Sequence, residues 1–448
     1  MSGARNATVR PTALAGYGVG DFGLNLYWSS LSLLLFFWYT DVVGISPATA
    51  GVIFFVGTLW DAATDPTMAA LAERTRTRWG AYRPFIAVGG AGLGASFVIL
   101  FGAPLAPGGA GLAGLIAAHL LFRTCYTVVA VPYSAMAARL TADSRERTLF
   151  SGVRMGFAFG GHLAVSACAF PLVRWAGDGD ERSAVGFVAL AVACAAGATA
   201  CLAATFALTN ETPPPVRALA GRWPTRMARA FAANAALCSM LIVIALQAAA
   251  MIVFQSALVY LLDGAATDVH AKERQLTVNA VAALASVPAW TWLAHRFGKR
   301  RVWVAASALF ALAGARLAFS GGAALAGAIV EIVAMAVANA GFGVLIWSMI
   351  PDTIEYGEWL TGARNESAAF GLGLLVQKTA IGLGALGFGL ALEGVGYADP
   401  AAFDAVAFRY VAALVPSVLI VLSAVAAMRH PVTRDGHAEA LAAIQRRG

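Results

Sequence analysis

The chain contains twelve apolar stretches, each long enough to cross a lipid bilayer. A membrane-spanning helix needs about 20 predominantly apolar residues, and only helices or closed barrels satisfy the backbone in lipid. Charged residues make up 12% of the sequence, against about 25% in soluble domains. We therefore expect an all-α, polytopic membrane protein with twelve transmembrane helices.

The basic residues indicate an orientation. Lys and Arg cluster in the loops that follow the second, fourth, sixth and eighth stretches, whereas loops 104–111, 320–323 and 395–402 hold none. Short basic loops stay cytoplasmic. We expect a cell inner (plasma) membrane protein with both termini cytoplasmic, whose net charge of +7 reflects topology and not nucleic-acid binding.

Two loops carry the same pattern. Residues 78–85 read RWGAYRPF and residues 296–303 read RFGKRRVW, which share Arg, aromatic, Gly, two residues, Arg, one residue and aromatic. The pattern predicts a tight glycine turn between two helices in each half of the chain, and a generic basic hairpin is the alternative. We expect two pseudo-symmetric six-helix bundles with a substrate site at their interface. The expected segments are bundle 1–209, cytoplasmic loop 210–231, bundle 232–428 and cytoplasmic tail 429–448.

Two aspartates, Asp61 and Asp65, interrupt the second apolar stretch. One aspartate at a bilayer centre costs about 2.5 to 3.5 kcal/mol, so a pair requires a cationic partner. Residues at i and i+4 share a helical face, and hard cations prefer oxygen ligands. Two close carboxylates can instead share a proton. The pair predicts a coupling-ion site for H⁺ or Na⁺, with a lean toward protons.

Several motifs occur together in one order along the chain. They are Tyr39–Gly44, Trp60–Pro66, Arg78–Pro84, Val131–Tyr133, Arg145–Arg147, Glu355–Glu358 and Gln377–Lys378. With them the chain resembles the glycoside-pentoside-hexuronide:cation symporters of the major facilitator superfamily. The resemblance implies twelve helices in two bundles and cation-coupled uptake of a sugar or glycoside.

The resemblance also implies the site residues. The cation site would comprise Asp61, Asp65 and Thr127, with Thr64 where a family member has an asparagine important for sodium. Lys378 matches an intramembrane lysine of the family and is expected to pair with Asp61 or Asp65, and snorkelling is the alternative. The expected substrate-binding residues are Asp21, Asn25, Arg123, Arg154, Trp347, Gln377 and Lys378.

Arg123 suggests the charge of the substrate. Arg123 and Thr127 stand on one face of the fourth predicted helix. With Arg154 and Lys378, Arg123 would give a cationic cavity suited to a carboxylate, which predicts an anionic sugar such as a uronide. The alternative is that Arg123 pairs with Asp21 as a structural or gating bridge.

Charged residues near the predicted cytoplasmic ends of the helices could form ion pairs that close the cytoplasmic mouth of the transporter. The alternative is that these charges simply face solvent in the loops. The expected gating residues are Arg145, Arg147, Asp352, Glu355, Glu358 and Arg364.

Two other functions fit parts of the sequence. The residues Gly18-Val-Gly-Asp21 match the G-x-G-D pattern of intramembrane aspartyl proteases, but so short a pattern arises by chance in a chain with 47 glycines. A lipid or lysolipid carrier or a nutrient sensor could share the fold. We expect a monomeric sugar or glycoside symporter in the lipid bilayer, not an enzyme. We expect no cofactor and no metal beyond a possible Na⁺.

Overall fold

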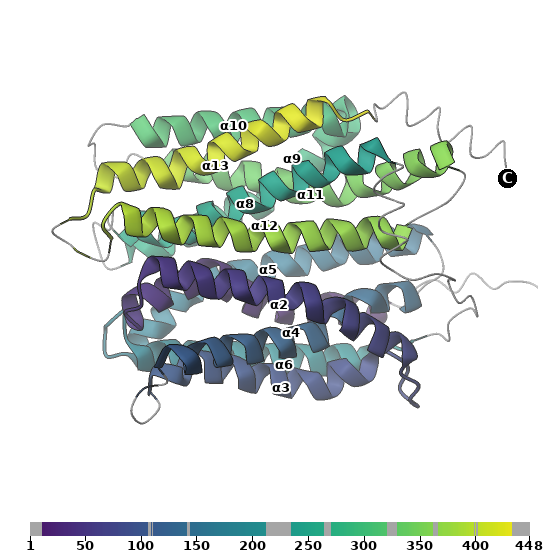
Figure 1. The fold of residues 1–448 in the computed structure, drawn as a ribbon. Helices are drawn as coiled ribbons and strands as arrows, with labels where there is room; N and C mark the ends of the chain where they lie inside the picture. Colours follow the sequence, from purple (N-terminus) through teal and green to yellow (C-terminus); the bar gives the residue numbers. More distant parts are fainter. Residues whose placement is uncertain are drawn as a thin grey trace, which may run out of the picture. The chain divides into compact units, whose positions relative to one another are not determined.

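The structure is a computed structural model, drawn as a ribbon in Figure 1. It describes residues 11–105, 109, 111–140, 144–211, 234–263, 270–319, 329–361, 366–397, 399 and 402–431. Within these ranges the regular elements are helices, and the one strand-like contact is an isolated bridge between Thr77 and Gly80. The predicted all-α class is confirmed.

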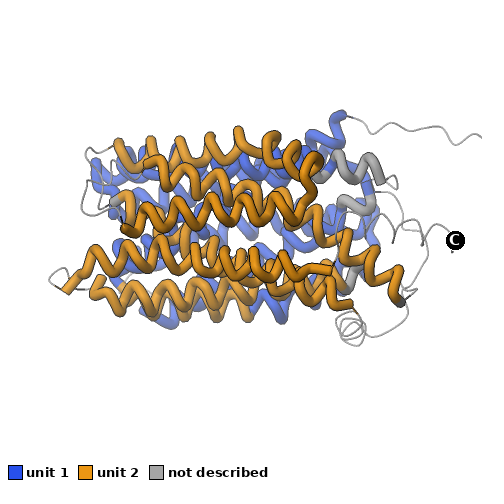
Figure 2. The backbone as a smooth tube through the Cα atoms, turned by 90° about the horizontal axis from the view of Figure 1, so that it is seen from above, with its two compact units in different colours: residues 1–44, 60–217 blue, residues 45–59, 218–448 orange. Residues whose placement is uncertain are grey.

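The chain divides into two compact units, coloured separately in Figure 2. Unit 1 comprises residues 1–44 and 60–217, and unit 2 comprises residues 45–59 and 218–448. Helix α2 (Pro47–Arg74) contributes its first part to unit 2 and the remainder to unit 1. The predicted segment limits stay a prediction, because 212–233 and 432–448 lie outside the described residues.

In unit 1, helix α1 packs against α5 and α6, and α3 packs against α4 and α6. Helix α1 continues into two short π-helical segments, η1 and η2, which lead toward α2. The elements of unit 1 besides α2 and the short turn η3 (Ala103–Leu105) are α1 (Pro11–Ser30), η1 (Leu31–Leu35), η2 (Trp38–Val42), α3 (Arg83–Gly102), α4 (Gly111–Leu140), α5 (Ser144–Ala176) and α6 (Ala184–Leu208).

Unit 2 repeats this packing order. Helix α8 packs against α12 and α13, and α10 packs against α11 and α13, while α9 packs against α11. The first helix of each unit therefore contacts the fifth and sixth, and the third contacts the fourth and sixth, as expected of pseudo-symmetric bundles. The elements are α8 (Ala235–Asp263), α9 (Ala271–Phe297), α10 (Lys299–Phe319), α11 (Ile329–Thr361), α12 (Glu366–Gly394) and α13 (Ala405–Met428).

Glycines allow the closest helix contacts in both units. A Cβ on Gly23 of α1 would lie 3.1 Å from the carbonyl oxygen of Ala198 in α6. In unit 2, a Cβ on Gly384 of α12 would lie 2.8 Å from the carbonyl oxygen of Ala249 in α8. Small residues at helix interfaces let the backbones approach, because packing rather than hydrophobic burial drives association in lipid.

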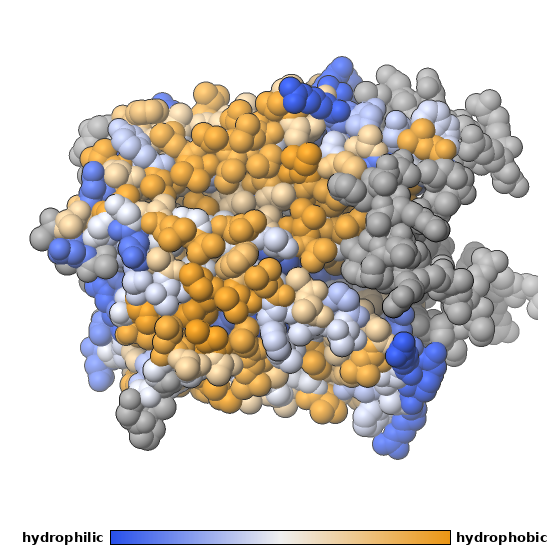
Figure 3. All heavy atoms as spheres, viewed as in Figure 1, coloured by the Kyte–Doolittle hydropathy of each residue, from blue (hydrophilic) through white to orange (hydrophobic). Residues whose placement is uncertain are grey.

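Ten of the described helices are long and apolar enough to cross a membrane. Helices α1 and α2 are not among these ten, so the count of twelve spans stays a prediction. Large apolar side chains such as Val88, Leu312 and Val330 are 71%, 68% and 72% exposed. Figure 3 shows hydrophobic residues covering much of the sides of the helices. Such surfaces suit contact with lipid, and the chain is a multi-pass membrane protein.

The two repeated loops contain glycine turns. Gly80 has a φ of +107° and Gly298 a φ of +89°, a conformation that only glycine adopts without strain. Gly298 ends α9, and its N–H donates to the carbonyl of Ala294 at 3.0 Å. The predicted tight glycine turns are confirmed at both positions.

Candidate functional site

Asp61 and Asp65 lie on the part of α2 that belongs to unit 1. Asp61 is 2% exposed, and Asp65, one turn later, is half-buried. Pro66 follows within the same helix and has no N–H to donate to the carbonyl of Ala62. The second half of α2 thus presents two carboxylates and a backbone oxygen that lacks its usual helical partner.

Arg123 of α4 forms an ion pair with Asp61. Its Nη2 lies 2.8 Å from Asp61 Oδ2, and the two side chains are 6% and 3% exposed. Removing one partner from such a buried pair would leave an uncompensated charge, which typically costs about 3–5 kcal/mol. The alternative pairing of Arg123 with Asp21 is wrong, because Asp21 binds Arg154.

Thr127 of α4 makes a second contact with α2. Its hydroxyl donates to Asp65 Oδ1 at 2.8 Å. Arg123 and Thr127 are one turn apart on α4, as are Asp61 and Asp65 on α2. Two polar side-chain pairs, one helical turn apart, therefore connect the two helices. The structure thus brings together three of the four predicted cation-site residues, and Arg123 joins them.

The fourth predicted residue, Thr64, faces its own helix. Its hydroxyl donates to the carbonyl of Trp60 at 2.9 Å. The indole Nε1–H of Trp60 donates to Thr124 of α4 at 2.8 Å. The Trp60–Thr124 bond joins α2 to α4, and its two residues are the direct sequence neighbours of Asp61 and Arg123.

A second ion pair joins α1 to α5. Arg154 Nε lies 2.9 Å from Asp21 Oδ1, with Arg154 37% and Asp21 5% exposed. Asn25 donates its side-chain amide to the Asp21 carbonyl at 2.8 Å. The Arg154 guanidinium lies 5.7 Å from the ring centre of Tyr133, which stacks on Tyr17 at 4.8 Å. Three predicted substrate residues of unit 1 therefore meet beside aromatic rings.

Two aromatic residues near these pairs were not predicted as site residues. Trp28 and Tyr126 are half-buried, with ring centroids 6.3 Å apart. The signal was present in the sequence, because Trp28 stands two turns after Asp21 on α1, and Tyr126 stands three residues after Arg123 on α4.

The remaining predicted substrate residues belong to unit 2. Trp347 of α11 is 42% exposed, and Gln377 and Lys378 of α12 are half-buried. Their roles, and the pairing of Lys378 with Asp61 or Asp65, stay predictions.

One predicted gating residue forms an ion pair within unit 2. Lys299 Nζ donates to both carboxylate oxygens of Asp352 at 2.8 Å and to the carbonyl of Ser348 at 2.7 Å. Glu355 and Glu358 are half-buried on α11. The side chains of Arg145 and Arg147, and the whole of Arg364, lie outside the described residues, so their gating role stays a prediction.

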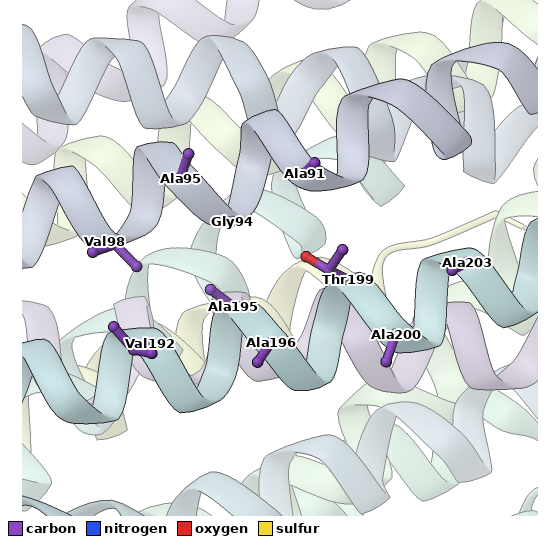
Figure 4. A pocket seen from close by; sticks show the side chains of 10 residues that line it. All are labelled: Ala91, Gly94, Ala95, Val98, Val192, Ala195, Ala196, Thr199, Ala200 and Ala203. Carbon is purple, nitrogen blue, oxygen red and sulfur yellow. The ribbon is translucent and has the colours of Figure 1, made fainter.

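A groove lies away from these pairs, between α3 and α6 (Figure 4). It contains one polar side chain, Thr199, and no predicted site residue. Its lining residues are Ala91, Gly94, Ala95, Val98, Val192, Ala195, Ala196, Thr199, Ala200 and Ala203. An open apolar groove of this kind lacks the convergent polar groups of a binding site for a sugar.

The sequence matches known transporters along most of its length. YagG of Escherichia coli (strain K12), provisionally described as a glycoside/cation symporter, is 40% identical over 167 residues, which are 37% of this chain and 36% of YagG. The isoprimeverose transporter of Lactiplantibacillus pentosus is 28% identical over 426 residues, 93% of this chain and 88% of that protein. The crystal structure of a D-xylose-proton symporter superposes with a TM-score of 0.72 at 14% identity, covering 95% of this chain and 98% of that one.

Residues 16–434 match the family described as MFS/sugar transport protein. This match confirms the resemblance to the glycoside-pentoside-hexuronide:cation symporters, and it places the chain among transporters rather than enzymes. The chain therefore belongs to the MFS/sugar transport protein family.

Proposed function

We propose that the protein is a secondary active symporter that imports a neutral sugar or glycoside together with a cation, by alternating access. The observation that carries the proposal is the Asp21–Arg154 pair, in which the Arg154 side chain is 37% exposed and its guanidinium lies 5.7 Å from the centre of the Tyr133 ring. Sugar hydroxyls both donate and accept hydrogen bonds, so a carboxylate next to a guanidinium suits them. A few placed polar groups among aromatic side chains are typical of small-molecule sites.

The charges of unit 1 favour a neutral substrate over a uronide. Arg123 is enclosed at 6% exposure and binds Asp61, so its guanidinium does not face a cavity as a free cation. Arg154 is more exposed, but Asp21 lies 2.9 Å from its Nε. Each arginine is thus matched by a carboxylate, and a substrate carboxylate at Arg154 would meet the negative charge of Asp21 as well.

Counterflow in proteoliposomes tests this proposal. Purified protein would be reconstituted with internal unlabelled isoprimeverose, a probe suggested by the named relative, and exchange of external labelled isoprimeverose would be recorded. We expect exchange by the wild type and little exchange of labelled methyl glucuronide. Exchange of the glucuronide alone would restore the anionic assignment. Absence of exchange for isoprimeverose, xylose and methyl glucuronide would contradict a sugar carrier and favour a lipid carrier or sensor.

The orientation is part of the proposal. The basic loops after the even-numbered spans support an inner-membrane protein whose termini are cytoplasmic. A C-terminal fusion to alkaline phosphatase should be inactive and a fusion to green fluorescent protein should fluoresce, and the reverse result would invert the orientation.

A further inference from the structure

Positive charge is concentrated where α9 ends and α10 begins. Residues 292–301, called here the α9–α10 turn, read WLAHRFGKRR and include four Lys or Arg and no Asp or Glu. We propose that the α9–α10 turn binds the headgroup of an anionic phospholipid. This inference goes beyond the proposed sugar transport and does not depend on it.

Three of the four basic side chains have no carboxylate partner among the described residues. Lys299 is engaged within unit 2, because its Nζ donates to both carboxylate oxygens of Asp352 at 2.8 Å. Arg296, Arg300 and Arg301 differ, since none of them forms an ion pair with a residue that the structure describes. Arg296 and Arg301 are exposed, and Arg300 is half-buried. Three guanidinium groups within six residues thus leave positive charge at the surface that an external anion can neutralise.

The matching turn of unit 1 binds an anion that belongs to the chain itself. The Glu211 carboxylate accepts the backbone N–H groups of residues 81–83 at 2.6 to 2.9 Å. A Cβ on Gly80 would lie 2.7 Å from this carboxylate, whereas a Cβ on Gly298, at the same position of the repeat, would meet no described atom within 4 Å. Both glycines have a positive φ. The repeated turn therefore has a conformation that suits an anion, and the α9–α10 turn adds three arginines to it.

The position of the α9–α10 turn favours a lipid as the source of this anion. Helices α9 and α10 are both apolar enough to span the membrane, so the turn lies where the chain leaves the bilayer. Trp292 and Phe297 are 61% and 46% exposed, with ring centroids 6.2 Å apart. Aromatic side chains are enriched at this depth, and basic residues next to it attract anionic lipids.

The two kinds of side chain match the two parts of a phospholipid. The Arg296 guanidinium lies 5.5 Å from the centre of the Phe297 ring, so a cation and an exposed aromatic surface lie together. Guanidinium groups bind phosphate oxygens through parallel N–H donors, while aromatic rings contact the glycerol and upper acyl region. A free phosphate ion would use the arginines alone, whereas a lipid uses both.

Lipid binding to the delipidated, full-length protein in a neutral detergent tests the proposal. Native mass spectrometry would compare phosphatidylglycerol with phosphatidylcholine of the same acyl chains. We expect the wild type to bind phosphatidylglycerol at least tenfold more tightly than phosphatidylcholine. The triple variant Arg296→Gln, Arg300→Gln, Arg301→Gln should lose this preference. Equal affinities of the wild type for the two lipids would overturn the proposal.

A matched triple variant separates a specific site from general attraction. Arg74→Gln, Arg76→Gln, Arg78→Gln removes the same charge from exposed positions at the repeated turn of unit 1. We expect this control to keep the preference for phosphatidylglycerol. An equal loss of the preference in both triple variants would show that net charge alone attracts the lipid, and would contradict a site at the α9–α10 turn.

Two further measurements keep the test decisive. If the triple variant of the α9–α10 turn does not fold, Arg301→Gln alone replaces it, and its affinity for phosphatidylglycerol should fall about fivefold. Unchanged affinity in folded Arg301→Gln would then overturn the proposal. Millimolar inorganic phosphate should leave phosphatidylglycerol bound to the wild type. Complete displacement by phosphate would instead indicate a site for a soluble anion and refute the lipid assignment.

Discussion

Arg154 on α5 donates its Nε–H to Asp21 on α1 at 2.9 Å, yet the two partners differ in exposure. Asp21 is 5% exposed, and Asn25 donates to its carbonyl at 2.8 Å, whereas 37% of the Arg154 side chain is accessible. The buried carboxylate therefore orients the guanidinium, as the proposed role of Arg154 in substrate binding requires.

Replacing Arg154 should lower sugar exchange. We expect Arg154→Gln to reduce isoprimeverose counterflow by at least tenfold, equivalent to about 1.4 kcal/mol. The counterflow rate of Arg154→Lys should fall between the rates of Arg154→Gln and the wild type, because lysine keeps the charge but lacks the planar fork of donors. Arg182→Gln serves as control, since Arg182 is 52% exposed and pairs with Asp41 at 3.5 Å. Wild-type exchange by Arg154→Gln would contradict a substrate role.

Glu211 connects the end of α6 to the first repeated loop. Its carboxylate accepts the backbone N–H groups of Ala81, Tyr82 and Arg83 at 2.9, 2.8 and 2.6 Å, where α3 begins. A negative charge at a helix N-terminus is favourable. Glu211→Gln leaves one acceptor oxygen and no charge, so we expect a loss of about 1–3 kcal/mol in unfolding free energy. Thermal unfolding in detergent measures this loss, and Glu73→Gln, at an exposed site, should leave the melting temperature unchanged.

The two glycine turns should respond differently to the same substitution. Both have positive φ, but a Cβ on Gly80 would lie 2.7 Å from the Glu211 carboxylate, whereas a Cβ on Gly298 would meet nothing within 4 Å. We expect Gly298→Ala to cost only backbone strain, about 1–3 kcal/mol, and Gly80→Ala to cost more. Unfolding of both variants and of Gly80→Ala combined with Glu211→Ala checks this, because the double variant removes the clash. Equal losses in the two single variants would contradict it.

Helical periodicity predicted which residues share a face, but not which helix lies opposite. The spacing of Asp61 and Asp65, and of Arg123 and Thr127, follows from 3.6 residues per turn. The partner of Arg123 depends on how α2 and α4 are rotated against each other, which no local pattern encodes. For this reason Asp21 was the partner considered for Arg123 in the sequence, and only the packed helices assign Arg123 to Asp61.

The glycine turns were predictable because positive φ has a residue signature. The Glu211 contact was not, because its partners are backbone N–H groups, which carry no sequence signal, and because about 130 residues separate them. Helices α1 and α2 illustrate a further limit, since they carry Asp21, Asn25, Asp61 and Asp65 of the candidate site and are not among the ten helices that hydropathy identifies as spans.

His430, just after α13, should make the stability of the protein depend on pH. The side chain is 3% exposed, and its Nδ1 lies 2.5 Å from the Ser239 hydroxyl. Burial lowers the pKa of His430 to about 4, with Arg300 also lowering it and Asp352 opposing the shift. In the unfolded chain the pKa of a histidine is about 6.5, so between these values the unfolded state binds more protons and acid favours unfolding.

We therefore expect the unfolding free energy to be largest above pH 6.5 and to fall, by an amount on the order of 1–3 kcal/mol, as the pH drops toward 4. His430→Gln cannot be protonated, so it should flatten this part of the stability curve while keeping a partner for Ser239. His270→Gln, at a side chain that is 66% exposed, should retain the wild-type slope. The unfolding free energies of the wild type, His430→Gln and His270→Gln would be measured with denaturant in detergent across this pH range. Parallel curves of unfolding free energy against pH for the wild type and His430→Gln would show that the buried imidazole is not the group that titrates.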